Sequence, residues 1–202
     1  MKSQELLEKV YSLIEVDAEK ALNLGRMNLG VLKSQDEIDS LNWAMGYALV
    51  TLRQYDEAEK IWRDIFERTG NHRALHQVGM VYREAGNLQK AFDVYSQEAN
   101  YVADDDWVSK CANLYELSYC NHLMGDSVEA KAYFKKYEGI KSDDLIERAC
   151  FFRLKGDLLK SENTEQSRQA YQISLEYFQS TSDEYGIKEI EQRLRELSNV
   201  MA

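Results

Sequence analysis

Residues 41–70, LNWAMGYALVTLRQYDEAEKIWRDIFERTG, decide the fold of this chain. Apolar residues recur at helical spacing on both sides of a polar turn, which indicates two amphipathic helices joined tightly. A near-copy follows at 73–102, RALHQVGMVYREAGNLQKAFDVYSQEANYV, and weaker copies continue toward the C-terminus. This periodicity predicts a repeated helix pair.

The copies share the position of their small residues. In three of them a small residue of the first helix precedes one of the second helix by 12 positions: Gly46 and Ala58, Gly79 and Ala91, Ser118 and Ala130. Two helices cross closely only where a small side chain faces a bulky one. We therefore expect Gly46 to admit a neighbouring helix and Trp62 to fill the space beside it.

This pattern resembles the tetratricopeptide repeat, which reads W-x2-L-G-x2-Y, then A-x3-F, then P, over ~34 residues. Ala58 and Ala91 are 33 residues apart, and Ala130 follows 39 residues later, which predicts a longer helix or loop near 104–106. The chain has no proline, and three other residues replace the first aromatic: Asn42, Leu75 and Leu114. The resemblance implies an all-α, right-handed α-α superhelix of about five helix pairs plus a C-terminal capping helix.

The repeat boundaries predict one solenoid domain over 1–202. It would comprise a divergent N-terminal helix pair in 1–36, repeats in 37–180 and a capping helix in 184–202, since end repeats of solenoids are atypical. The expected helices are 3–16, 18–33, 37–52, 56–69, 72–85, 88–102, 106–124, 127–139, 143–160, 164–180 and 184–199.

Polar residues and glycines predict where several helices begin or pack. Asp17 and Asp143 are candidate N-caps, because a side-chain oxygen there can accept from the first backbone N–H groups. Gly25 and Gly30 each cost ~1 kcal/mol relative to Ala inside a helix. We expect neighbouring helices to approach closely at both glycines.

Composition restricts the partners. The 202 residues carry a net charge of −10, which disfavours duplex DNA or an anionic membrane as the main partner. No apolar run approaches the ~20 residues of a membrane span, and the start lacks the apolar core of a secretory signal. We therefore expect a cytoplasmic protein. The three cysteines fit this reading, and we expect all three to be small buried hydrophobes: Cys111, Cys120 and Cys150.

The sequence offers no catalytic constellation. His72 and His76 have a spacing that can bind a metal, but no third ligand is evident. Asp104 to Asp106 lack the pattern of a calcium loop and should instead end one helix and cap the next. The charged run EIEQRLREL at 189–197 reads as a solvated helix face. We predict no enzyme activity, no metal site and no cofactor.

A set of aromatic and charged residues lies beside the packing stripe of the first helices. Aromatics with a few cations bind peptides well, because they offer a large contact area at low entropic cost. The resemblance implies that these positions line a concave groove, although Trp43 and Tyr119 could instead pack on the next repeat. The predicted ligand-binding residues are Trp43, Tyr47, His76, Arg83, Tyr115, Tyr119 and Arg153. The fourth copy also places Asp157 and Lys160 at equivalent positions.

One specific binding mode of the family is missing. The resemblance would allow a two-carboxylate clamp for a chaperone tail, made of Lys, Asn and Arg. The matching positions hold Trp43, Tyr47, Gln77, Ala112 and Glu116. A chaperone-tail co-chaperone is therefore not expected.

The predicted function is a non-catalytic scaffold or adaptor that binds a protein or peptide partner, not nucleic acid or membrane. One alternative is a bacterial regulatory protein that senses a signalling peptide, because 174–197 resembles the C-terminal repeats of such regulators; no DNA-binding helix-turn-helix is evident at the start of the chain. A second alternative is a homo-oligomeric assembly protein, such as a homodimer, in which end helices pair between subunits.

Overall fold

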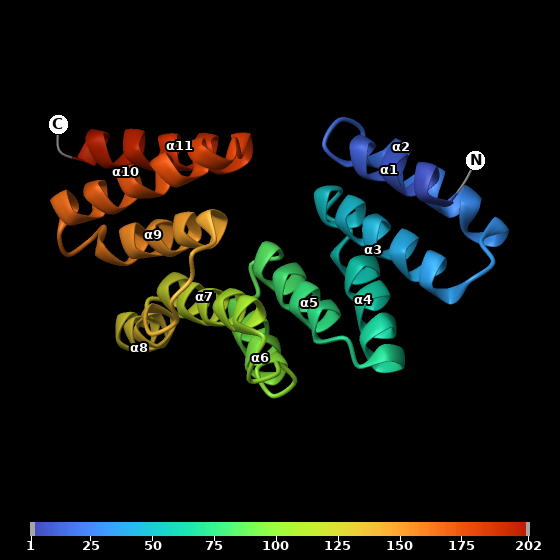
Figure 1. Cartoon of the computed structure of the whole chain (residues 1–202), viewed down its shortest axis with the longest axis horizontal. Coiled ribbons are helices and arrows are strands. Elements are labelled where there is room, and N and C mark those ends of the chain that lie inside the picture. The colour runs from blue at the N-terminus through green and yellow to red at the C-terminus, as the bar shows by residue number, and fades with distance from the viewer. Residues whose placement is uncertain (1–2, 201–202) are drawn as a thin grey trace. The chain divides into compact units, whose positions relative to one another are not determined.

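The computed structural model describes residues 3–200, which form eleven α-helices and no β-strand (Figure 1). No helix in this range is both long and apolar enough to cross a membrane. In chain order the elements are α1 (Ser3–Ile14), α2 (Ala18–Asn28), the 3-10 turn η1 (Leu29–Val31), α3 (Gln35–Thr51), α4 (Tyr55–Thr69), α5 (His72–Glu84), α6 (Leu88–Glu98), α7 (Trp107–Met124), α8 (Ser127–Glu138), α9 (Leu145–Leu159), α10 (Thr164–Thr181) and α11 (Glu184–Val200).

The helices belong to two compact units, Met1–Tyr101 and Val102–Ala202. In the first unit α1 packs on α2, α3 on α4 and α5 on α6, and successive pairs pack on one another. In the second unit α7 packs on α8, α9 on α10, and α11 on α10. The prediction of an all-α array of five helix pairs and a final helix is confirmed. The single continuous domain over 1–202 stays a prediction.

The N-caps explain why the helices begin where they do. Asp17 accepts a hydrogen bond from the backbone N–H of Lys20 at 3.0 Å, as predicted. Asp106 caps α7 in the same way, through the N–H of Ser109 at 3.0 Å. The predicted cap at Asp143 is wrong by one residue. Asp144 caps α9, because its side chain is the one that accepts from the N–H of Glu147, at 2.8 Å.

Glycine allows the helices of each pair to approach. A Cβ added to Gly46 would lie 2.5 Å from the ring of Trp62, and one added to Gly79 would lie 2.5 Å from the ring of Tyr95. Both rings are fully buried. The expected contact of Gly46 with Trp62 is therefore present, and the second repeat reproduces it with a tyrosine.

The two glycines of the N-terminal pair differ. A Cβ on Gly25 would lie 2.6 Å from the Met45 side chain, so the close approach predicted there is confirmed. The same prediction for Gly30 is wrong. Helix α2 ends at Asn28, and Gly30 lies in the exposed turn η1 with no neighbouring atom within 4 Å of an added Cβ.

The fourth repeat keeps the same packing with a shifted turn. Gly156 faces the ring of Tyr171, and the Oγ of Ser167 donates to the carbonyl of Gly156 at 2.8 Å. Helix α9 ends three residues after Gly156, whereas α3 ends five residues after Gly46. This earlier end explains why Ser167 follows Gly156 by 11 residues, whereas Ala58 follows Gly46 by 12.

The cysteines lie in the interior of the second unit. Cys111 and Cys120 are buried and Cys150 is half-buried, and none forms a disulfide within the described residues. Burial raises the pKa of Cys111 to about 12 and that of Cys150 to about 11. Such thiols stay protonated at neutral pH and are poor nucleophiles.

Candidate functional site

The first two predicted residues lie one turn apart on α3. The Nε1 of Trp43 donates to the hydroxyl of Tyr47 at 3.2 Å. Both rings meet Trp62 edge-on, with centroid distances of 6.4 Å for Trp43 and 5.4 Å for Tyr47. Both side chains are half-buried. They thus pack on the core and also present part of their surface outward.

A cavity of about 410 Å³ lies beside Trp43 in the first unit. Its walls include Tyr11 of α1, Asp36 and Asp39 of α3, and Ile65 of α4; we call it the Trp43 cavity. Tyr11 is 41% exposed, and Asp36 is also exposed. Arg68 binds Asp39 at 2.6 Å and neutralises its charge. The wall carries one further carboxylate, that of Asp36.

His76 and Arg83 lie outside this cavity, on α5. The Nδ1 of His76 is 2.9 Å from Oε2 of Glu98, and the Nδ1 of His72 is 3.6 Å from Oε1 of the same residue. Glu98 is 1% exposed. Among residues 3–200, no group of three His, Cys, Asp or Glu is placed to hold a metal ion. Arg83 contacts the neighbouring Glu84 at 3.2 Å.

The predicted residues of the second unit lie on α7 and α9. Tyr115 is only 8% exposed, and its hydroxyl accepts from Nε of Arg153 at 3.0 Å. The Arg153 guanidinium also lies 5.2 Å from the centre of the Tyr115 ring, within the range of a cation–π contact. Tyr115 therefore positions Arg153 from the interior. Tyr119 is half-buried, and its ring stacks with His122 at a centroid distance of 6.4 Å.

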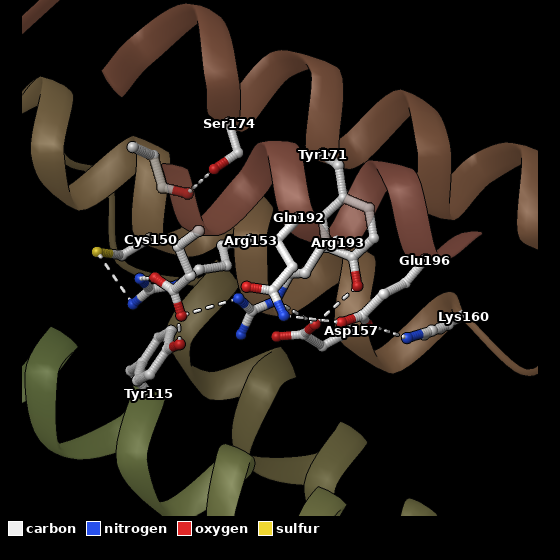
Figure 2. A network of polar contacts seen from close by, with 12 residues as sticks. Tyr115, Cys150, Arg153, Asp157, Lys160, Tyr171, Ser174, Gln192, Arg193 and Glu196 are labelled. Carbon is white, nitrogen blue, oxygen red and sulfur yellow. Dashed lines mark hydrogen bonds and ion pairs between the residues drawn. The ribbon is translucent and has the colours of Figure 1, made fainter. Parts of the chain in front are cut away.

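Arg153 begins a network of charges that continues to α11 (Figure 2). Its Nη1 is 2.5 Å from Oε2 of Glu189, and the other carboxylate oxygen of Glu189 is 2.8 Å from Nη1 of Arg193. The Nε of Arg193 donates to Oδ1 of Asp157 at 2.9 Å, and the Tyr171 hydroxyl donates to the same oxygen at 2.7 Å. We call these five side chains the Arg193 network.

The network shifts the pKa values of Glu189 and Arg193. Burial would raise the pKa of Glu189, but the guanidiniums of Arg153 and Arg193 outweigh it and hold that pKa below its usual value. Burial works against the charge of Arg193, whereas Asp157 and then Glu189 raise its pKa. Glu189 and Arg193 therefore keep their charges at neutral pH. The interpretation of 189–197 as a solvated face is wrong for Glu189 and Arg193, because each of them forms an ion pair with a residue of α9.

A second cavity, of about 390 Å³, borders this network in the second unit. Its walls include Tyr119 and His122 of α7, Asp157 and Lys160 of α9, and Glu189 and Arg193 of α11; we call it the Asp157 cavity. At its rim, Nζ of Lys160 is 3.3 Å from Oε2 of Glu196. Of the predicted set, Tyr119 alone lines this cavity.

The sequence pattern placed Asp157 beside the packing stripe but not in the predicted set, and it did not select Glu189 or Arg193. A spacing rule could have found them, since three opposite-charge pairs each span 36 residues: Arg153–Glu189, Asp157–Arg193 and Lys160–Glu196. That distance is close to one repeat, so each pair joins equivalent positions of α9 and of α11, the helix one repeat later. A charged residue that is followed one repeat later by a residue of opposite charge therefore indicates an ion pair between the two repeats.

A third cavity, of about 290 Å³, lies between α8 and α9. Tyr137 and Glu147 line it, and the Tyr137 hydroxyl donates to Oε1 of Glu147 through a short contact. Burial raises the pKa of Glu147, and hydrogen bonds from Tyr137 and Cys111 only partly offset this effect. Nearby Asp144 raises the pKa further.

Glutamine at position 147 is expected to stabilise the second unit at neutral pH. A carboxyl whose pKa is raised by folding contributes stability below its unfolded pKa and loses it as the pH rises through the folded pKa. Wild type should therefore lose stability as the pH rises above the ordinary carboxyl range, and Glu147→Gln should lose less. Urea unfolding between acidic and neutral pH measures this difference. Glu138→Gln, at an exposed position, is the control, and equal pH slopes for Glu147→Gln and wild type would contradict the assignment.

Comparison with known proteins supports the fold. The chain matches no family model and no curated protein sequence. A tetratricopeptide repeat protein from Parabacteroides merdae is similar in structure, with a TM-score of 0.75 and 18% identity over 98% of this chain and 71% of that one. Pseudomonas aeruginosa pilF gives a TM-score of 0.58 and 16% identity over 96% of this chain and 93% of the other.

Bacillus thuringiensis PlcR is also similar in structure. The match, to PlcR solved in complex with the peptide PapR7 and DNA, has a TM-score of 0.71 and 16% identity over 98% of this chain and 74% of PlcR. At such identities the likeness establishes the fold, not the ligand. The repeated glycine–aromatic crossings and these structural matches together show that the chain has the fold of the tetratricopeptide repeat proteins.

Proposed function

We propose that the chain is a non-catalytic scaffold that binds a protein or peptide segment through the outward faces of its first helices. The observation that carries this proposal is the Trp43 cavity, in which Tyr11 and Trp43 stand beside Asp36 and Asp39. Aromatic side chains with a polar tip supply most of the contact energy in many peptide interfaces. A volume of about 410 Å³ can hold one or two side chains of a bound segment.

The charge of the cavity favours a basic and apolar segment. Asp36 is exposed at the wall, whereas Asp39 is neutralised by Arg68. A Lys or Arg of the partner would pair with Asp36 while its stem lies on the rings of Tyr11 and Trp43. The net charge of −10 would also speed the approach of a cationic partner.

The predicted residues divide into three groups under this proposal. Trp43 and Tyr119 would contact a ligand, because each lines a cavity. Tyr47 and Tyr115 would act by positioning Trp43 and Arg153, to which they are hydrogen-bonded. His76 and Arg83 would extend the surface along α5 only for a partner that reaches beyond the Trp43 cavity.

Selection from a random peptide library tests the proposal. We expect the selected peptides to be enriched in Lys or Arg next to an apolar residue, and Tyr11→Ala to weaken their binding about tenfold. Tyr185→Ala is the matched control, because Tyr185 is an exposed tyrosine of the second unit. Fluorescence anisotropy with labelled peptides gives the affinities, after circular dichroism establishes that both variants are folded.

Two results would overturn the proposal. The first is a selection that enriches acidic peptides, or none. The second is binding that Tyr11→Ala and Tyr185→Ala weaken equally. Either result would remove the Trp43 cavity as the binding surface and leave no observation to carry the scaffold function.

A receptor for a free signalling peptide is a second candidate. The observation in its favour is the structural similarity to PlcR, whose solved complex holds the peptide PapR7. If the receptor contacts a free end of its peptide, fusion of the selected peptide within a folded protein removes that end and weakens binding. If both ends are dispensable, the free and the fused peptide bind equally well. Loss of binding on fusion at both ends would favour the receptor over the adaptor.

Assembly into homo-oligomers is a third candidate. Large apolar side chains are exposed on the N-terminal helix pair, among them Val16 and Met27, each 82% exposed. Burial of such residues between copies would stabilise a dimer. A mass that stays monomeric over a wide concentration range in sedimentation equilibrium would exclude it.

A further inference from the structure

Asp157 carries a buried oxygen without a partner. Its Oδ1 accepts from both Tyr171 and Arg193, whereas Oδ2 has no hydrogen-bond partner among residues 3–200. The residue is only 7% exposed. A buried carboxylate oxygen that lacks a donor is costly, at about 1–3 kcal/mol or more. A site that keeps such an oxygen is therefore suited to a donor from outside the chain.

The orphaned oxygen belongs to a residue that lines the Asp157 cavity. The cavity measures about 390 Å³, and its other walls include Tyr119 and His122 on one side and Lys160 on another. Two stacked rings thus line the same cavity as the carboxylate. A small polar group with an apolar stem fits this combination.

The charges around the cavity balance. Three carboxylates face three cations in fixed pairs, because Glu189 binds Arg153, Asp157 binds Arg193 and Glu196 binds Lys160. An added anion would meet Asp157 and Glu189, and an added cation would meet Arg193 and Lys160. A neutral ligand avoids both penalties. It must still donate to Asp157.

We propose that the Asp157 cavity binds a neutral amide group, whose N–H donates to Oδ2 of Asp157. The amide carbonyl would face the cationic wall formed by Lys160, and the adjoining carbons would contact the ring of Tyr119. An Asn or Gln side chain of a peptide and a free carboxamide share this chemistry. The site lies in the second unit, so it stands whether or not the Trp43 cavity binds a peptide.

Three probes of nearly equal shape test the ligand class: propionamide, propionate and propylammonium. In a titration followed by backbone amide NMR shifts, propionamide should bind the wild-type chain most tightly and move resonances of residues around the cavity. The peptide Ac-Ala-Gln-Ala-NH2 distinguishes the source of the amide. Tighter binding than propionamide would indicate a peptide, and equal binding would indicate a small molecule. Both results support the amide site.

Asparagine at position 157 tests the role of Oδ2. Asp157→Asn keeps the shape but places an NH2 group where an acceptor stood, so propionamide should bind about tenfold more weakly. Glu191→Gln is the control on α11, because Glu191 is an exposed carboxylate that does not line the Asp157 cavity. It should change the affinity for propionamide less than about twofold.

Three results would overturn the inference. Tighter binding of propylammonium or propionate than of propionamide would assign the cavity to a charged ligand. Absence of propionamide binding would leave the cavity as hydrated surface. Equal binding by a folded Asp157→Asn variant would remove Oδ2 as the acceptor. The three-probe comparison uses wild type alone, so it decides the ligand class even where Asp157→Asn unfolds.

Discussion

Alanine at Gly46 is expected to lower the free energy of unfolding by about 1–3 kcal/mol, the usual cost of overpacking a core. The added Cβ would lie 2.5 Å from the Trp62 ring, and Trp62 is fully buried. The ring cannot move without disturbing Trp43 and Tyr47, whose rings both meet it edge-on. The clash therefore outweighs the ~1 kcal/mol that alanine gains over glycine as a helix former.

Urea unfolding of the variant measures this cost, and Gly30→Ala is its control. Gly30 has no atom within 4 Å of an added Cβ, so alanine there should change stability by less than about 1 kcal/mol. Gly79→Ala should reproduce the loss seen at Gly46, since its Cβ would lie 2.5 Å from the ring of Tyr95. A Gly46→Ala variant as stable as wild type would show that the close crossing does not hold the repeat together.

Alanine at Arg193 is expected to cost about 3–5 kcal/mol, the usual effect of removing one partner from a buried ion pair. Arg193 has a side chain that is only 16% exposed, and it binds both Asp157 and Glu189. Its loss would leave the carboxylate of Asp157 buried with only the Tyr171 hydroxyl as donor. Helix α11 would also lose its link from Arg193 to α9, and Glu189 would lose one of its two cations.

Thermal and urea unfolding of the second unit would report this loss. Arg195→Ala is the matched control on the same helix, because its side chain is 68% exposed and lies 3.8 Å from Glu191. An exposed pair of this kind contributes less than about 1 kcal/mol. Equal losses at the two positions would mean that the Arg193 network is screened by water. A double variant with Asp157→Ala should recover part of the loss, which a double-mutant cycle would measure.

The helices could be predicted from the sequence because their determinants are local. Apolar spacing places each helix, and caps such as Asp17 and glycines such as Gly70 define its ends. The error at Asp143 arose where two acidic residues stand side by side and only backbone geometry selects Asp144. The error at Gly30 arose because a 3-10 turn replaces the last turn that was expected of α2.

The candidate sites were less predictable because they depend on contacts between repeats. Trp43 could be selected from its position beside the packing stripe. Nothing in the local sequence around Tyr115 shows that its side chain is buried under Arg153. Glu189 and Arg193 sit in a run of alternating charges, and only the partners 36 residues earlier distinguish them from solvated neighbours such as Arg195.

The measurement that tests the scaffold function most directly is a map of backbone amide NMR shifts on addition of a selected basic peptide. We predict that the largest changes fall on α1 and α3 around Tyr11 and Trp43, and that Tyr11→Ala removes them at the same peptide concentration. Changes confined to exposed residues that do not line the Trp43 cavity, such as Val16 and Met27, would contradict the proposed binding surface.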